Sequence, residues 1–196
     1  MQLFSISELV DIAAMTLFVG YIFSSYLPKK DYSDPLKYYE RNRWIDIDGL
    51  KFAIMATAPA IIVHELAHKF VAIGFGLHAI FYAFYRNSFY LILGVFALIM
   101  KLSGGGFFFI VPGFVGIEGA GTHIQFALTA FAGPFVNLVL WLIASLILKK
   151  RLYKKKHYML LILTQRINMF LFIFNMLPIP GFDGYGFYSE MIRAFL

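Results

Sequence analysis

Long apolar stretches separated by short polar segments dominate this chain. Four of them approach the roughly 20 mostly apolar residues that a membrane-spanning helix needs. They cover residues 9–27, 50–76, 122–148 and 157–177, and only Asp11 interrupts the first, near one end. The pattern predicts an all-α polytopic membrane protein with about four transmembrane helices.

The region between the second and third stretches departs from this pattern. Its two apolar runs, residues 89–100 and 107–117, are too short to span a membrane comfortably, and a glycine-rich segment separates them. Proline and glycine in the second run favour a re-entrant hairpin or short β-strands over helices. Such backbone at membrane depth must be satisfied by protein or water, so the region is expected to line a cavity. The alternative is an ordinary fifth helix near residues 89–101, which would raise the number of spans to five or six.

The composition agrees with a bilayer as the solvent. Of the 196 residues, 60% are hydrophobic and 14% are charged, which is more apolar than the roughly half expected of a soluble domain. The length fits one domain, and no repeat or low-complexity linker suggests a second. Residues 1–196 are therefore interpreted as a single membrane-embedded domain without accessory domains.

The formal charge of +6 raises the question of a nucleic-acid partner. The Lys and Arg residues, however, form short clusters beside the apolar stretches, six in residues 28–51 and six in residues 149–156. This distribution is typical of membrane proteins, where it fixes orientation. The expected surroundings are a lipid bilayer, with no nucleic acid.

The second apolar stretch contains the pattern His-Glu-x-x-His, with His64, Glu65 and His68. Residues i and i+4 of a helix share a face, so both imidazoles can reach one metal ion. Glu65 lies on the shoulder of that face, where its carboxylate can take a proton from metal-bound water. Because the chain has no cysteine, His, Asp or Glu must supply every ligand to a transition metal.

The position of this motif along its helix strengthens the functional interpretation. At 1.5 Å per residue, His64 lies roughly 20 Å beyond Lys51, well within a hydrocarbon core about 30 Å thick. Ionisable groups at that depth cost several kcal/mol unless they are partnered, and they usually mark functional sites. The same holds for Lys69, which directly follows the motif.

Catalytic zinc usually has three protein ligands and one open position, so a further carboxylate is expected. Asp183 is the best-placed candidate, because the prolines and glycines of residues 178–184 break the fourth helix. An unwound chain can turn a carboxylate inward there. Taken alone, an Asp-Gly pair after prolines is more often a plain turn.

The two motifs together resemble those of the site-2 protease family of intramembrane zinc metalloproteases. That family carries His-Glu-x-x-His on one core helix and Asn-x-x-Pro-x-x-x-x-Asp-Gly at the end of another. Asn175, Pro178, Asp183 and Gly184 match the second pattern without an insertion. The resemblance covers about residues 50–184, which would be the catalytic core. Ala67 and Phe182 differ from the commonest family residues, at variable positions that do not bind metal.

The resemblance implies one Zn²⁺ per chain, bound by His64, His68 and Asp183, with Glu65 as the catalytic base. The activity it implies is hydrolysis of peptide bonds in transmembrane protein substrates. Since every carbonyl of a membrane helix is hydrogen-bonded, such a substrate must unwind locally before attack. Strand-like segments after residue 76 would hold the unwound part by edge pairing.

A third feature, Gly133-Pro134-x-x-Asn137, is similar to the Gly-Pro-x-x-Asn of the middle core helix in many members of the family. Gly133 and Pro134 permit close helix approach and a local kink. In the family the Asn lies near the metal. Asn137 is therefore expected to act in catalysis by hydrogen bonding to the substrate or the developing oxyanion, and a polar contact between helices is the alternative.

The other polar residues receive no catalytic role. His78, His123 and His157 lie near segment ends, as interfacial residues do, and are not assigned to the metal. Arg166 lies inside the fourth stretch, where a guanidinium must face the helix bundle or snorkel to an interface.

Two other classes of function compete with the protease. A catalytically silent scaffold that binds client helices does not need Glu65. A metal transporter usually shows repeated halves, which this sequence lacks. The predicted location is a multi-pass position in a cell membrane, most simply prokaryotic; the oligomeric state and the physiological substrate are left open.

Membrane orientation is also left open, because two arguments conflict. If the spans alternate, both basic clusters lie on the face away from the metal. The positive-inside rule then puts them in the cytoplasm and the metal nearer the outside, whereas the family resemblance favours access from the cytoplasmic side.

Overall fold

The structure is a computed structural model that describes residues 3–24, 47–103 and 113–196. Within these described residues, four helical segments are by length and composition apolar enough to cross a membrane, as expected of a multi-pass protein. They are α1 (Ile6–Phe23), α3 (Ile47–Gly74), α5 (His123–Lys149) and α6 (Tyr158–Asn175), the last extended by a 3₁₀ turn from Lys155. Each coincides within a few residues with a predicted stretch, so the predicted fold class is confirmed.

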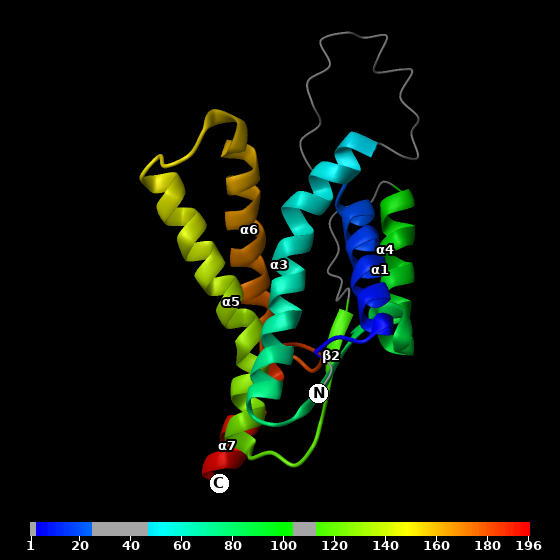
Figure 1. The fold of residues 1–196 in the computed structure, drawn as a ribbon, viewed down its shortest axis with the longest axis vertical. Helices are drawn as coiled ribbons and strands as arrows, with labels where there is room; N and C mark the ends of the chain where they lie inside the picture. Colours follow the sequence, from blue (N-terminus) through cyan, green and yellow to red (C-terminus); the bar gives the residue numbers. More distant parts are fainter. Residues whose placement is uncertain (1–2, 25–46, 104–112) are drawn as a thin grey trace.

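Helix α3, which carries the histidines, is the central helix of the bundle (Figure 1). Helix α1 packs against one side of α3 and α5 against another, while α6 contacts both α5 and α3. Helix α1 ends, and α3 begins, at the same end of the bundle as the α5–α6 turn. The basic segment of residues 149–156 therefore lies at the end of the bundle away from His64 and His68, as alternating spans predict.

The region between α3 and α5 contains both a helix and strands. The run predicted as a hairpin or strands at 89–100 is instead helix α4 (Ser88–Leu102), the fifth-helix alternative. Its N-cap is Asn87, whose side chain accepts from the backbone N–H of Phe89. A capped, continuous apolar run of this length favours helix. Of the second run, residues 107–112 lie outside the described part of the chain, and the rest begins a strand.

That strand, β2 (Gly113–Glu118), pairs antiparallel with β1 (His78–Ala83), and Phe81 lies opposite Val115. Between β1 and α4 lies the 3₁₀ turn η1 (Phe84–Arg86). The short β element predicted between the second and third spans is thus present, although its first strand lies earlier in the chain than the segments proposed from sequence.

A glycine turn connects α3 to β1. Gly76 has a positive φ of 78°, its N–H bonds to the Ile73 carbonyl at 2.9 Å, and the Leu77 N–H bonds to the Ala72 carbonyl at 3.0 Å. These two bonds form a Schellman motif, in which glycine avoids the penalty of left-handed backbone. Leu77 and Ala72 also share a hydrophobic cluster, so the chain reverses sharply and brings β1 back beside α3.

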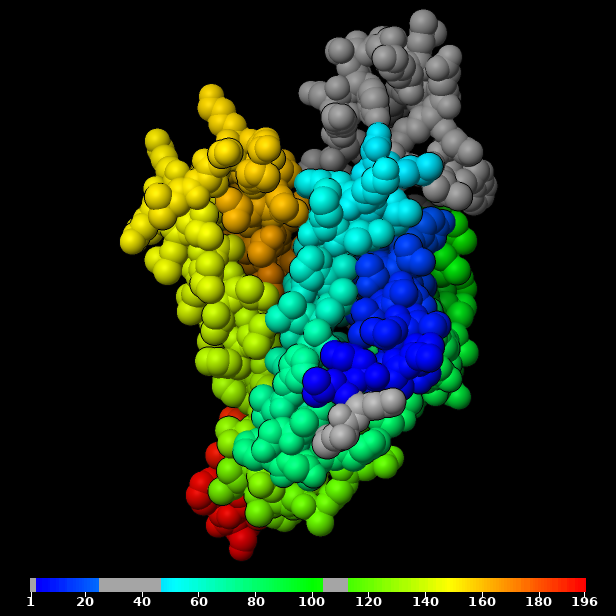
Figure 2. All heavy atoms as spheres, viewed as in Figure 1, coloured from blue at the N-terminus to red at the C-terminus, as the bar shows by residue number. Residues whose placement is uncertain are grey.

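The outer surface is consistent with a lipid environment. Figure 2 shows α1 and α4 on one side of α3 and the α5–α6 pair on the other. Large apolar side chains are exposed along these helices, among them Leu17, Ile92, Ile99 and Leu142. Arg166 is also exposed, and its guanidinium group forms no hydrogen bond or ion pair with any residue in the described part of the chain. It therefore points outward from the bundle.

Candidate metal centre

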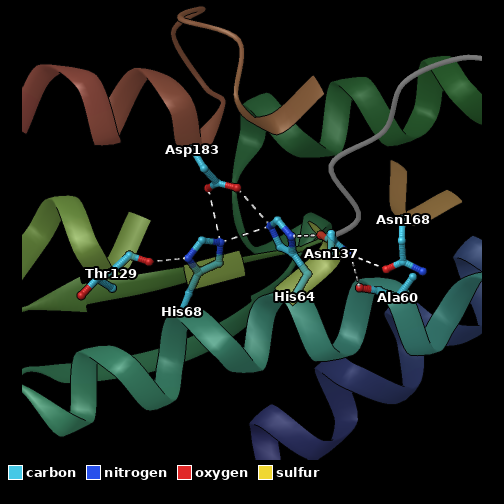
Figure 3. A network of polar contacts seen from close by, with 7 residues as sticks. All are labelled: Ala60, His64, His68, Thr129, Asn137, Asn168 and Asp183. Atoms are coloured by element: carbon cyan, nitrogen blue, oxygen red, sulfur yellow. Dashed lines mark hydrogen bonds and ion pairs between the residues drawn. The ribbon is translucent and has the colours of Figure 1, made fainter. Parts of the chain in front are cut away.

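The structure brings the three predicted metal ligands together (Figure 3). Asp183 Oδ2 lies 3.0 Å from His64 Nε2, and Asp183 Oδ1 lies 3.4 Å from His68 Nε2. The two Nε2 atoms are 3.1 Å apart. Both imidazoles are buried, at 5% exposed each. The carboxylate belongs to a segment more than a hundred residues after the histidines in the sequence.

Hydrogen bonds on the far side of each ring fix which nitrogen faces the carboxylate. His68 Nδ1 lies 2.7 Å from the Thr129 carbonyl oxygen, which can only accept, so Nδ1 donates. His64 Nδ1 contacts Asn137 Oδ1. The Asn137 amide N–H groups donate to the Ala60 carbonyl at 3.2 Å and to Asn168 Oδ1 at 2.7 Å. With the amide oriented in this way, His64 Nδ1 donates as well.

The donor set fits a divalent metal such as zinc. In the neutral imidazoles each Nε2 then presents a lone pair, so two lone pairs and a carboxylate converge on one point with no proton to separate them. A cation between them removes this repulsion. The three distances also approach the edge of a tetrahedron of zinc ligands, about 3.3 Å for bonds of about 2.0–2.1 Å.

Gly133 keeps the space between these ligands open. A Cβ at this position would lie 2.3 Å from His68 Nε2 and 2.6 Å from His64 Nε2, closer than van der Waals contact permits. The glycine lets α5 approach α3 without placing a side chain where the ligand atoms converge. This explains, in physical terms, the glycine of the Gly-Pro motif.

A backbone turn directs Asp183 toward the histidines. Helix α6 ends at Asn175, the following turn contains Gly181 with a φ of 96°, and helix α7 (Asp183–Phe195) begins at the ligand itself. A Cβ at Gly184 would lie 2.5 Å from the carbonyl carbon of Met176. The Asp-Gly pair therefore allows the first turn of α7 to lie directly on the end of α6.

Helix α7, which the sequence did not predict, packs against α5, and its contacts with His123 and Phe131 lie in the first half of that helix. His123 lies 2.7 Å from Glu190 on α7, and Arg193 lies 2.7 Å from the same carboxylate. The His123 hydrogen bond, aided by Arg193, holds the pKa of Glu190 below its usual range.

The three histidines set aside as interfacial, His78, His123 and His157, are all exposed and lie outside the cluster of His64, His68 and Asp183.

A cavity of about 470 Å³ opens beside the three ligands, and Glu65 lines it. The Glu65 side chain is only 7% exposed, yet no described residue donates a hydrogen bond to it. It is thus a carboxylate next to the metal ligands that is available to water or substrate. The cavity is otherwise lined by residues of α3, α4, β2, α5, α6, the turn before α7 and α7 itself, including Tyr90, Val115, Phe170, Phe174, Asn175 and Phe182.

Sequence reasoning did not identify every residue that supports the site. The Thr129 contact is made by a backbone carbonyl, which leaves no signature in the side chains. Asn168 could have been found as a polar residue in an apolar span. Asn137 is fully buried and both groups of its amide are bonded within the protein, so the substrate contact expected of it stays a prediction.

These contacts predict that Asn137 supports metal binding. Replacing it by leucine removes the acceptor for His64 Nδ1 and frees the ring to change tautomer, and loss of such a support typically costs 10- to 100-fold in metal affinity. Chelator competition with the purified Asn137→Leu protein measures the change. The matched control is Gln165→Leu, which removes another α5–α6 hydrogen bond, to Ser145 at 2.9 Å. Equal affinities for Asn137→Leu and wild type would contradict the prediction.

Comparisons with known proteins bear on the identity of this metal. No family model matches the chain, and no solved structure matches it. The chain is 33% identical over 184 residues to Putative zinc metalloprotease MJ0611 of the archaeon Methanocaldococcus jannaschii, an alignment that covers 92% of this chain and 83% of that protein. The zinc in the relative's name agrees with a donor set of two imidazoles and a carboxylate. The chain therefore belongs to the same zinc metalloprotease family as this archaeal protein.

Proposed function

We propose that the chain is an intramembrane zinc endopeptidase of the site-2 protease type, which hydrolyses peptide bonds of transmembrane protein substrates. The observation that carries the proposal is the convergence of His64, His68 and Asp183 beside a cavity that also exposes the Glu65 carboxylate. These groups lie among helices long and apolar enough to span a membrane.

The depth of the ligands supports cleavage within the bilayer. His64 follows the start of α3 by 17 residues, which corresponds to about 26 Å along the helix axis. Ile61, Phe170 and Leu171 are among the apolar residues that line the cavity with the ligands. An environment of this kind admits an apolar membrane segment more readily than a soluble peptide.

Each polar group then has a role in the reaction. A zinc ion held by the three ligands would supply an activated water and a Lewis acid for the scissile carbonyl. Glu65 accepts the proton of the attacking water and passes it to the leaving amine, as a general base that becomes a general acid. Asn137 and the Thr129 carbonyl hold the imidazoles in the tautomer that the metal requires.

The outer edge of β2 is a suitable place to hold an unwound substrate. Because the Phe81 N–H bonds away from β2, to Glu8, Phe81 and Val115 form a non-hydrogen-bonded pair. The N–H and C=O of Val115 therefore point away from β1, and Val115 lines the cavity. In the described sheet, which consists of β1 and β2, this edge is unpaired. An extended substrate segment can add to it as a third strand.

The test is to purify the chain in detergent and compare cleavage of membrane-helix substrates by wild type and Glu65→Gln. Loss of the general base is expected to lower cleavage by about 10²- to 10⁴-fold, while bound zinc stays at one ion per chain. Glu118→Gln, at the exposed end of β2, is the matched control, and removal of zinc by a chelator should stop wild-type cleavage. Equal cleavage by wild type and Glu65→Gln would contradict the role of Glu65.

The same preparation separates the two alternative functions. A silent scaffold predicts zinc binding and substrate binding without cleavage by the wild-type protein. A metal transporter predicts zinc uptake into liposomes that is insensitive to Glu65→Gln. Cleavage that depends on Glu65, without zinc uptake, agrees with the protease alone.

A further inference from the structure

Lys69 lies directly after the metal-binding motif but on the side of α3 that faces α1. It is 1% exposed, and its ammonium group contacts the carboxylate of Glu8, which is 4% exposed. The Phe4 ring lies 4.6 Å from the ammonium group. A buried ion pair is costly to desolvate and is weak support for stability in itself. Stability alone therefore does not explain why this pair lies beside the His-Glu-x-x-His motif.

Glu8 is bonded to three separate elements. Oε2 accepts from the Ser5 N–H at 2.8 Å and completes the N-terminal cap of α1. Oε1 accepts from Lys69 on α3 and from the Phe81 N–H on β1 at 2.9 Å. One carboxylate thus connects the start of α1, helix α3 and the edge of β1 that faces away from β2.

Asp11, one turn further along α1, extends this attachment. It is 1% exposed, accepts from the Tyr85 hydroxyl, and lies 3.2 Å from Arg86 Nε. Tyr85 and Arg86 belong to η1, which directly follows β1. Figure 2 shows the N-terminal half of α1 lying over the segment after α3, in agreement with the α1–β1 contacts. Glu8 and Asp11 together are called the α1 carboxylate pair below.

We propose that the α1 carboxylate pair and Lys69 are positioning residues for the substrate. They bind β1 on its edge away from β2. Strand β1 in turn sets the position of β2 through the register in which Phe81 lies opposite Val115. The opposite edge of β2 is thereby set at the cavity beside the metal ligands, where it can pair with an extended segment of a membrane helix. This inference rests on the proposed function and assigns the N-terminal helix a part in substrate affinity.

The decisive variant is the double replacement Glu8→Met with Lys69→Met. Apolar residues of similar volume often replace a buried ion pair without loss of stability, but methionine offers the Phe81 N–H no comparable acceptor. If the Glu8–Lys69 ion pair has only a structural role, KM and kcat both stay at wild-type values. If it positions β1, KM rises about tenfold while kcat changes less than about twofold, the pattern of lost binding without lost transition-state chemistry.

Two measurements independent of turnover accompany the kinetics. In a zinc-loaded Glu65→Gln background, the affinity for a fluorescent membrane-helix substrate should fall by the same factor, about tenfold. Amide hydrogen exchange should accelerate in β1 and β2 and not in α5. Bound zinc should remain at one ion per chain.

Matched variants complete the test. Lys101→Met removes another lysine contact with α1, to the Tyr21 carbonyl and the Ser24 hydroxyl, at the far end of the helix; it should leave KM unchanged. Tyr85→Phe, at an exposed position, removes a single bond to Asp11 and should raise KM about two- to threefold, even if the double variant does not fold. Unchanged KM and affinity in the folded double variant, or unchanged KM in Tyr85→Phe, would overturn the inference. Absence of wild-type cleavage would instead refute the proposed function.

Discussion

Replacing Asp183 with asparagine is expected to abolish zinc binding at working concentrations and, with it, cleavage. The substitution keeps the shape of the side chain but removes the charge from the group that lies 3.0 and 3.4 Å from the two Nε2 atoms. The loss of zinc affinity should exceed the 10- to 100-fold typical of changes behind the ligands, because a ligand itself is altered. Chelator competition and metal analysis of the purified protein measure it.

The fold should survive this change. Asp183 is the first residue of α7, where a carboxylate favours the helix N-terminus by only about 0.3–1 kcal/mol. Asp48→Asn, in the first turn of α3, makes the same chemical change away from the cavity and should bind zinc as wild type does. If Asp183→Asn retained wild-type zinc affinity, Asp183 would not be a ligand.

Gly133→Ala is expected to prevent metal binding while leaving the helix intact. The added methyl group would lie 2.3 and 2.6 Å from the two imidazole Nε2 atoms, so it would occupy the point where the ligands converge. Alanine nevertheless favours a helix interior over glycine by about 0.8–1.0 kcal/mol. Zinc affinity and cleavage should therefore fall to background, while helix content by circular dichroism stays at the wild-type level.

Gly186 provides the matched control, since it is also a helical glycine that lines the cavity. A Cβ there would meet the Cβ of Ala130 at 3.5 Å, an ordinary contact. Gly186→Ala should therefore bind zinc normally. Normal zinc binding by Gly133→Ala would show that α3 and α5 lie farther apart than the structure places them.

The predictable part of the fold is the part that follows from local composition. Four apolar stretches of sufficient length predict four spans, because a single apolar segment in lipid can satisfy its own backbone hydrogen bonds only as a helix. The same reasoning failed at residues 89–100, where a run too short to span was assigned to a hairpin or strands and forms α4. Length decides whether a helix can cross a membrane, but it does not decide whether a helix forms.

The convergence of His64, His68 and Asp183 was predictable for a different reason. The i, i+4 spacing of His64 and His68 places both side chains on one face of a helix. Asp183 follows helix-breaking residues with the spacing of the Asn-x-x-Pro-x-x-x-x-Asp-Gly pattern. The supporting contacts lacked such signals. Thr129 acts through its carbonyl, and Glu8 reaches Lys69 and Phe81 across more than sixty residues. Pairing over such separations depends on how the helices pack, which no local pattern in a single sequence specifies.

X-ray absorption at the zinc edge, on the wild-type protein loaded with metal, is the most direct measurement of the central claim. The structure predicts one zinc ion per chain with two imidazole nitrogens and one carboxylate oxygen from the protein, at about 2.0–2.2 Å. A protein that binds less than one ion per chain at saturating zinc, or a spectrum without imidazole scattering, would contradict it.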